Sequence, residues 1–155
     1  MTPEFADLLI QRLDLNEEEA KKFDRQIWEQ YGKHGAVLIS DMSGFSRLTS
    51  EHGITHFLSL IAQRRALVIP IVERFKGKFV KAEADDVFLL FPTPLEGLNA
   101  SLAIFQALQK WNQGKPEKCH IHASHAIAYG WLLDLGDDYF GHPVNIASKL
   151  GEDIA

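Results

Sequence analysis

The chain has 155 residues, 46% of them hydrophobic, and a net charge of −5 at pH 7. This length supports a single hydrophobic core that buries about two-thirds of the surface of the unfolded chain, so a second domain of ordinary size is excluded. The lysines and arginines are dispersed, whereas a protein that binds a nucleic-acid backbone normally presents a basic face. We therefore expect no nucleic-acid partner.

The single cysteine, Cys119, has no partner for an internal disulfide. The N-terminus lacks the basic start and the apolar run of a secretory signal, and the longest apolar runs elsewhere are too short to span a bilayer. We expect a reducing, cytoplasmic setting and no insertion into a membrane.

Residues 1–34 have the pattern of helices. Apolar side chains recur at helical spacing over residues 5–13, and Asn16 with Glu19 resembles a capping box at the start of a second helix. Residues 32–35, which begin and end with glycine, are the only plausible joint between this segment and the rest of the chain. The segment can pack on its own domain or on a partner, and we expect the first arrangement.

The next pattern is a buried strand that ends in a carboxylate. Residues 36–40 (AVLIS) are almost wholly apolar and partly β-branched, and Asp41 comes directly after them. Gly44 permits a tight turn into a helix that begins near Phe45. Asp41 therefore lies where a strand meets a turn, a place typical of a carboxylate that holds a hard cation against a phosphate. Alternatively, Asp41 only caps the helix that follows, because aspartate is also a preferred residue at a helix N-terminus.

A β-hairpin is predicted further along the chain. KFVKAEA (residues 78–84) and DVFLLF (residues 86–91) are separated by almost no turn material, so the tip carries Ala84 and Asp85. Beside the first strand, such a hairpin would bring Asp85 to Asp41. Taken alone, Asp85 would merely make the turn.

Two long helices flank this hairpin in the sequence. The first is predicted over residues 56–75, with Pro70 as a kink, and the second over residues 94–111. The apolar residues of the second helix, which suit the other side of the layer, are Leu102, Ile104, Phe105 and Leu108.

The stretch CHIHASHAIAYG (residues 119–130) contains histidines that resemble metal ligands. In a strand, His120 and His122 share one face, whereas His125 points to the other, with its apolar neighbours. This geometry argues against a zinc site. We predict instead that His125 is buried and hydrogen-bonded.

Three blocks, ISDMSGFS (residues 39–46), KAEADDVFLLF (residues 81–91) and DYFGHPVNIASKL (residues 138–150), occur in this order. Together they resemble the signature blocks of the class III nucleotidyl cyclase domain, over roughly residues 35–155. That family makes cyclic AMP or cyclic GMP from the triphosphate. The resemblance implies an α/β (α+β) fold, a ferredoxin-like sandwich of helices on an antiparallel sheet, behind the helical segment of residues 1–34.

The resemblance also implies a metal site. The family's two metal-binding aspartates fall on Asp41 and Asp85, and its backbone carbonyl ligand falls on Met42. These residues imply two Mg²⁺ or Mn²⁺ ions, because hard cations prefer oxygen ligands and can neutralise charge on the triphosphate.

The residues that read the base and serve the transition state are implied in the same way. The base-reading lysine and aspartate fall on Lys81 and Asp138, and the transition-state asparagine and arginine fall on Asn145 and Lys149. Lys81 can donate to an adenine ring nitrogen while Asp138 accepts from the amino group, so the pair favours ATP over GTP. Singly, each could be an ordinary surface residue.

The chain departs from the family pattern at three places. Lys149 lacks the planar fork of arginine, which predicts low turnover or none. Ala84 replaces a glycine, which matters only if the backbone there needs φ > 0. Family members continue with further strands and a phosphate-binding lysine, so the chain is either a minimal version or a C-terminally truncated part of a longer protein.

Two functions are consistent with these residues. The first is an adenylate cyclase that converts ATP to cyclic AMP and pyrophosphate, acting as the family's head-to-tail homodimer with active sites at the interface. The second is a catalytically degenerate domain that binds nucleotide or a partner in a regulatory or dimerisation role. The intact aspartates and base-reading pair favour the first function, whereas Lys149 and the short C-terminus favour the second.

Overall fold

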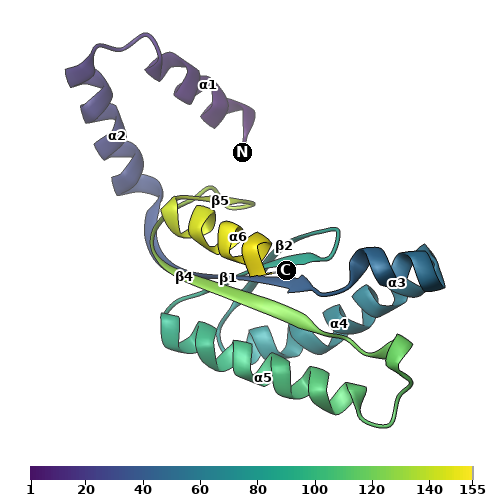
Figure 1. Ribbon diagram of the computed structural model, residues 1–155. Coiled ribbons are helices and arrows are strands. Elements are labelled where there is room, and N and C mark those ends of the chain that lie inside the picture. Colours follow the sequence, from purple (N-terminus) through teal and green to yellow (C-terminus); the bar gives the residue numbers. More distant parts are fainter. Residues whose placement is uncertain (155) are drawn as a thin grey trace.

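The computed structural model describes residues 1–154 and, within them, the side chains of residues 1–151. Residue 155, the last of the expected cyclase-like domain, lies outside this part. One sheet carries helices on both faces, and two further helices stand outside this sandwich (Figure 1). The elements are α1 (Pro3–Arg12), α2 (Glu17–Tyr31), β1 (Gly32–Met42), α3 (Phe45–His52), α4 (Ile54–Arg74), β2 (Lys78–Glu83), β3 (Asp86–Phe91), α5 (Pro94–Asn112), the 3-10 helix η1 (Glu117–Cys119), β4 (Ala123–Asp134), β5 (Tyr139–Phe140) and α6 (His142–Ile154).

The sheet is antiparallel and has the strand order β2-β3-β1-β4-β5. β1 lies in the middle and pairs with β3 on one side and β4 on the other. The predicted β2–β3 hairpin is present, and its pairing with β1 sets Asp86 opposite Asp41. The expected fold class, helices packed on one antiparallel sheet, is confirmed.

Both faces of β1 are buried, which explains its almost wholly apolar sequence. Ala36 and Leu38 face the larger core, which α4 and α5 cover. Val37 and Ile39 face a smaller core on the opposite side, which α6 covers. Side chains therefore alternate between the two cores along the strand, and Asp41 continues the series that faces α6.

The position of α5 corrects one expectation. This helix lies beside α4 on the same face of the sheet, and not on the other side of the layer (Figure 1). The buried face of α5 runs through Gly97, Ile104 and Leu108, which follow helical spacing. Leu102 and Phe105 lie outside this stripe and are 52% and 40% exposed. The apolar residues of α5 thus occupy two faces, and their pattern alone does not fix the side on which it packs.

α1 and α2 form a helical hairpin ahead of the sheet. The predicted capping box is confirmed, because the Asn16 side chain accepts from the Glu19 amide at 2.9 Å and the Glu19 carboxylate accepts from the Asn16 amide at 3.1 Å. Arg12 joins the two helices through two hydrogen bonds to Asp24. Within residues 1–154, no helix is long and apolar enough to cross a bilayer.

Candidate functional site

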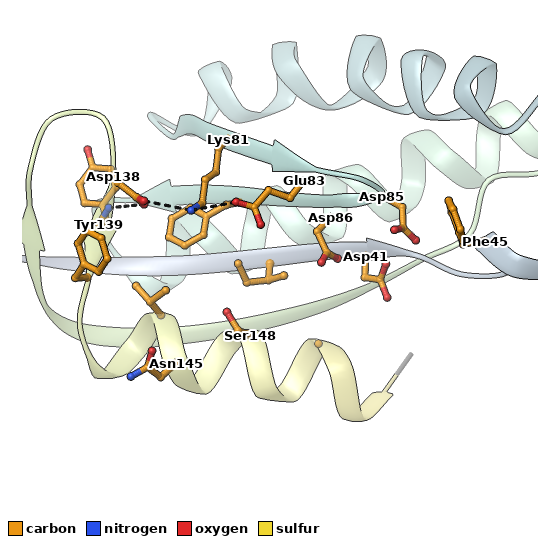
Figure 2. Close-up of a pocket in the computed structure, with 15 residues that line it drawn as sticks. Asp41, Phe45, Lys81, Glu83, Asp85, Asp86, Asp138, Tyr139, Asn145 and Ser148 are labelled. Atoms are coloured by element: carbon orange, nitrogen blue, oxygen red, sulfur yellow. Dashed lines mark hydrogen bonds and ion pairs between the residues drawn. The ribbon is translucent and has the colours of Figure 1, made fainter. Parts of the chain in front are cut away.

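A cavity of about 600 Å³ lies on the α6 side of the sheet, between the end of β1, the β2–β3 hairpin, β5 and α6 (Figure 2). A group of carboxylates lies at one end, and a lysine–aspartate pair lies at the other. The expected site residues that line it are Asp41, Lys81, Asp85, Asp138 and Asn145.

Three carboxylates form what we call the acidic end: Asp41, Asp85 and Asp86. The register of β1 and β3 sets Asp86 opposite Asp41, and the hairpin tip brings Asp85 close to Asp41 (Figure 2). Burial, followed by the charges of Asp85 and Asp86, raises the pKa of Asp41 to about 7. Sequence spacing suggests the meeting of Asp41 and Asp85, but it does not reveal Asp86, whose place depends on strand register.

The turn that carries Asp85 is strained and is held from inside the protein. Ala84 has a φ of 50°, so the departure from glycine at this position has a structural cost. Arg64 of α4 donates from Nη2 to the main-chain oxygen of Asp85 at 2.5 Å. The sequence motifs do not single out Arg64. The available signal was a charge on the apolar face between Leu60 and Val68.

Lys81 and Asp138 meet at the other end of the cavity, with 3.3 Å between Lys81 Nζ and Asp138 Oδ2 (Figure 2). Glu83 adds a second carboxylate at 3.5 Å from the same nitrogen. Burial opposes the charge of Lys81, but the hydrogen bond with Asp138 and the two negative charges outweigh it and raise the pKa of Lys81. The Tyr139 amide donates to Asp138 Oδ1 at 2.8 Å, which fixes this carboxylate in place.

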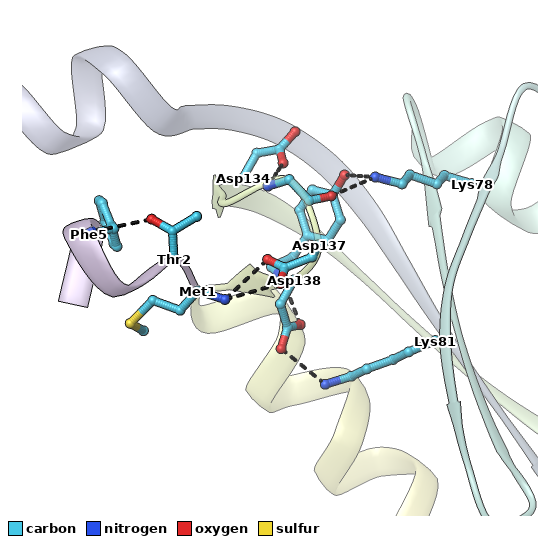
Figure 3. A network of polar contacts seen from close by, with 10 residues as sticks. Met1, Thr2, Phe5, Lys78, Lys81, Asp134, Asp137 and Asp138 are labelled. Atoms are coloured by element: carbon cyan, nitrogen blue, oxygen red, sulfur yellow. Dashed lines mark hydrogen bonds and ion pairs between the residues drawn. The ribbon is translucent and has the colours of Figure 1, made fainter.

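The loop before Asp138 is tied to distant parts of the chain (Figure 3). The N-terminal ammonium of Met1 lies 3.2 Å from both carboxylate oxygens of Asp137, and this hydrogen bond is the main reason that the pKa of Asp137 is lowered. Lys78 donates to the main-chain oxygen of Gly136 in this loop at 3.0 Å, and to the Tyr139 hydroxyl just after it at 3.0 Å. The N-terminal segment therefore contacts its own domain next to the lysine–aspartate pair.

Two expected site residues do not contribute side chains to the cavity. Lys149 is exposed and lies outside the lining, whereas Asn145 and Ser148 of the same helix belong to it. The Met42 side chain is 2% exposed and packs in the core with α4 and α5. Only the main chain of Met42 is therefore available to the acidic end.

The acidic end suits a cation that arrives with a phosphate ligand. Among the described residues, no three His, Cys, Asp or Glu side chains form a group that could hold a metal ion by themselves. Mg²⁺ is usually bound by one or two carboxylates together with substrate phosphates, and Asp41 and Asp85 provide that number. The raised pKa of Asp41 reflects burial first and the neighbouring charges of Asp85 and Asp86 second, and a divalent cation would offset that repulsion.

The sequence and fold are similar to those of the adenylate/guanylate cyclase/hydrolase from Silicibacter pomeroyi. That crystal structure is 30% identical, with a TM-score of 0.70, and the match covers 79% of this chain and 71% of that chain. The chain belongs to the adenylate/guanylate cyclase family. No protein-family model matches it.

Two longer curated proteins are also similar to the chain. A putative adenylate cyclase 3 of Rhizobium meliloti is 28% identical over 116 residues, which are 74% of this chain and 20% of that protein. The serine/threonine-protein kinase pkn2 of Myxococcus xanthus is 24% identical over 110 residues, which are 71% of this chain and 13% of the kinase. The chain thus spans only a small part of the length of these two curated relatives.

Proposed function

We propose that the chain is an adenylate cyclase domain that converts ATP to cyclic AMP and pyrophosphate. One observation carries the proposal: in a chain of the cyclase family, the acidic end and the Lys81–Asp138 pair lie at opposite ends of one cavity. Its volume of about 600 Å³ is within the range of small-molecule sites. A nucleotide in this cavity would lie with its triphosphate at the acidic end and its base at the pair.

In this reaction the ribose 3′ oxygen forms a bond to the α-phosphorus, and the bond from that phosphorus to the β-phosphate bridging oxygen breaks. The 3′ proton leaves to solvent or to a basic group, and pyrophosphate departs. Asp41, Asp85 and the main-chain oxygen of Met42 would hold two Mg²⁺ or Mn²⁺ ions. Such ions lower the pKa of the 3′ hydroxyl and offset the charge of the triphosphate.

The lysine–aspartate pair supports ATP as the substrate. Lys81 offers a donor and Asp138 an acceptor, which match the ring nitrogen and the amino group on one edge of adenine. Guanine presents the reverse polarity at that edge, so it would set its ring N–H against the Lys81 donor and its carbonyl oxygen against the Asp138 carboxylate.

A head-to-tail homodimer is part of the proposal. Among the described residues, those of α6 that line the cavity carry no positive charge, and Lys149 lies outside it. Lys81 is the only cation among the described residues of the lining and lies at the other end, with Asp138, so a second copy would add a cation near the acidic end. Asn145 and Lys149 would then stabilise charge on the α-phosphate from across the interface.

The division of the chain follows from this assignment. We assign residues 35–155 to the cyclase domain and residues 1–34 to an N-terminal helical segment. A degenerate domain that binds nucleotide without turnover is the second candidate, and the exposure of Lys149 outside the cavity favours it.

Incubation with ATP or GTP in the presence of Mn²⁺ or Mg²⁺, followed by chromatography, tests the proposal. We expect cyclic AMP and pyrophosphate in equal amounts, more cyclic AMP than cyclic GMP, and no product from Asp85→Asn. Asp14→Asn, a matched change at an exposed loop aspartate, should keep wild-type activity. Binding of a fluorescent ATP analogue without any cyclic product would refute the cyclase activity in favour of the degenerate domain.

A further inference from the structure

We propose that Arg64 is a positioning residue for the acidic end, and that its hydrogen bond to the main chain of Asp85 holds the hairpin tip where Asp85 and Asp41 can share a divalent cation. The inference deepens the proposed function and rests on it. Arg64 belongs to α4, on the opposite side of the sheet from the cavity, and does not line the cavity, so its role is indirect.

Arg64 occupies a position where an apolar residue is expected. It is 1% exposed, and its helix α4 buries apolar side chains one turn before and one turn after it, at Leu60 and Val68. A buried charge is costly unless it is paired or hydrogen-bonded. An arginine at this position is therefore unfavourable for packing alone, which points to another role.

The polar contacts of Arg64 are directed at the acidic end. Nη2 donates to the Asp85 carbonyl oxygen at 2.5 Å, whereas Nε and Nη1 have no hydrogen-bond partner among the described residues. Burial lowers the pKa of Arg64, and the charges of Asp85, Asp41 and Asp86 oppose this effect. The guanidinium thus lies close enough to the three carboxylates to interact with them through its charge.

The bond goes to the main chain of Asp85 and leaves its carboxylate available to a cation. This matters because the preceding residue, Ala84, has a φ of 50°, a conformation that a non-glycine residue keeps only when its surroundings impose it. Metal ligands must lie within a few tenths of an ångström of their productive positions. A fixed donor from α4 supplies this constraint on the turn.

Charge and position predict opposite effects on cation binding. If Arg64 acted through its charge alone, an uncharged substitute would bind a divalent cation more tightly, because one nearby positive charge would be gone. If Arg64 positions the turn, the same substitution weakens binding. The sign of the change therefore separates the two roles.

The test is the binding of Mn²⁺ to the full chain in the presence of 3′-deoxy-ATP, which carries the phosphate ligands but cannot cyclise, measured by the rise in water proton relaxation when the Mn²⁺ complex joins the protein. We expect R64M to bind Mn²⁺ about tenfold more weakly than wild type, the lower end of the usual effect of removing a group that orients a metal ligand. R64K keeps a charged donor on a long side chain and should bind Mn²⁺ more tightly than R64M does. The matched control is R65M, because the neighbouring Arg65 is exposed and lies over the Phe79 ring.

Thermal unfolding checks that each variant folds. If R64M does not fold, R64Q replaces it, and the same loss of Mn²⁺ binding is expected. Wild-type or tighter Mn²⁺ binding by folded R64M overturns the inference, as does an equal loss in R64K and R64M. A wild-type chain that binds no Mn²⁺ overturns this inference and the proposed metal site together. Because the assay needs no turnover, an inactive chain that binds Mn²⁺ would refute only the cyclase activity.

Discussion

His125 should make the stability of the fold depend on pH. Its ring is half-buried and stacks on Phe105 with 4.2 Å between centroids, and Nδ1 lies 2.7 Å from Ser101 Oγ, so the predicted hydrogen bond is confirmed, whereas the burial is only partial. Burial, and next the charge of Arg64, lowers the pKa of His125 from 6.5 to about 4. The unfolded chain therefore binds a proton near pH 6.5, whereas the folded chain does so only near pH 4.

The size and sign of the effect follow from this difference. Since the unfolded state binds more protons between these two pKa values, stability is highest above pH 6.5 and falls as the pH drops toward 4. A difference of about 2.5 between the pKa values corresponds to about 3 kcal/mol of unfolding free energy. We expect wild type to lose this amount relative to His125→Gln, which does not titrate.

Urea unfolding at several pH values between 7 and 4 measures the difference, because other titrating groups contribute equally to both proteins. Parallel pH dependences for wild type and His125→Gln would refute the reasoning. They would mean that His125 binds its proton equally well in the folded chain.

Three further predictions concern the cavity. Ala84→Gly should raise the unfolding free energy by about 1 kcal/mol, because glycine adopts a φ of 50° without strain; a lower melting temperature would contradict this. Lys81→Glu with Asp138→Ser should lower the ratio of kcat/KM for ATP to that for GTP, and an unchanged ratio would show that this pair does not read the base. If active sites form across a homodimer, the variants Asp85→Ala and Asn145→Ala should each be inactive alone and should recover activity when they are mixed. The recovery should increase with protein concentration, because dimer formation depends on concentration. No recovery, despite measured exchange of subunits, would exclude shared sites.

Patterns of neighbouring residues were sufficient to predict several local elements of the fold, two of which border the cavity. The apolar run before Asp41, the short turn at Asp85 and the capping box at Asn16 each depend on residues close in sequence, and the structure contains all three features. These patterns act through backbone preferences and burial within a few residues.

Other features depend on contacts between distant residues and could not be predicted in the same way. Asp86 faces Asp41 because of one particular β1–β3 register, and Arg64 reaches Asp85 because of how α4 crosses the sheet. The prediction of the side on which α5 packs was wrong for a related reason, since the apolar residues of α5 occupy two helix faces. The roles of Asn145 and Lys149 remain predictions, and the mixing experiment tests the role of Asn145.

The central position of β1 has a consequence for the order in which the protein forms. β1 leaves the ribosome before both of its neighbours, and its partners β3 and β4 emerge only after long intervening helices. The apolar residues of β1 therefore remain unpaired during synthesis, whereas β2 and β3 can pair with each other as soon as both have emerged. The acidic end needs β1 and β3 together, and the cavity also needs β5 and α6, so the cavity is complete only after these two later elements have packed against β1.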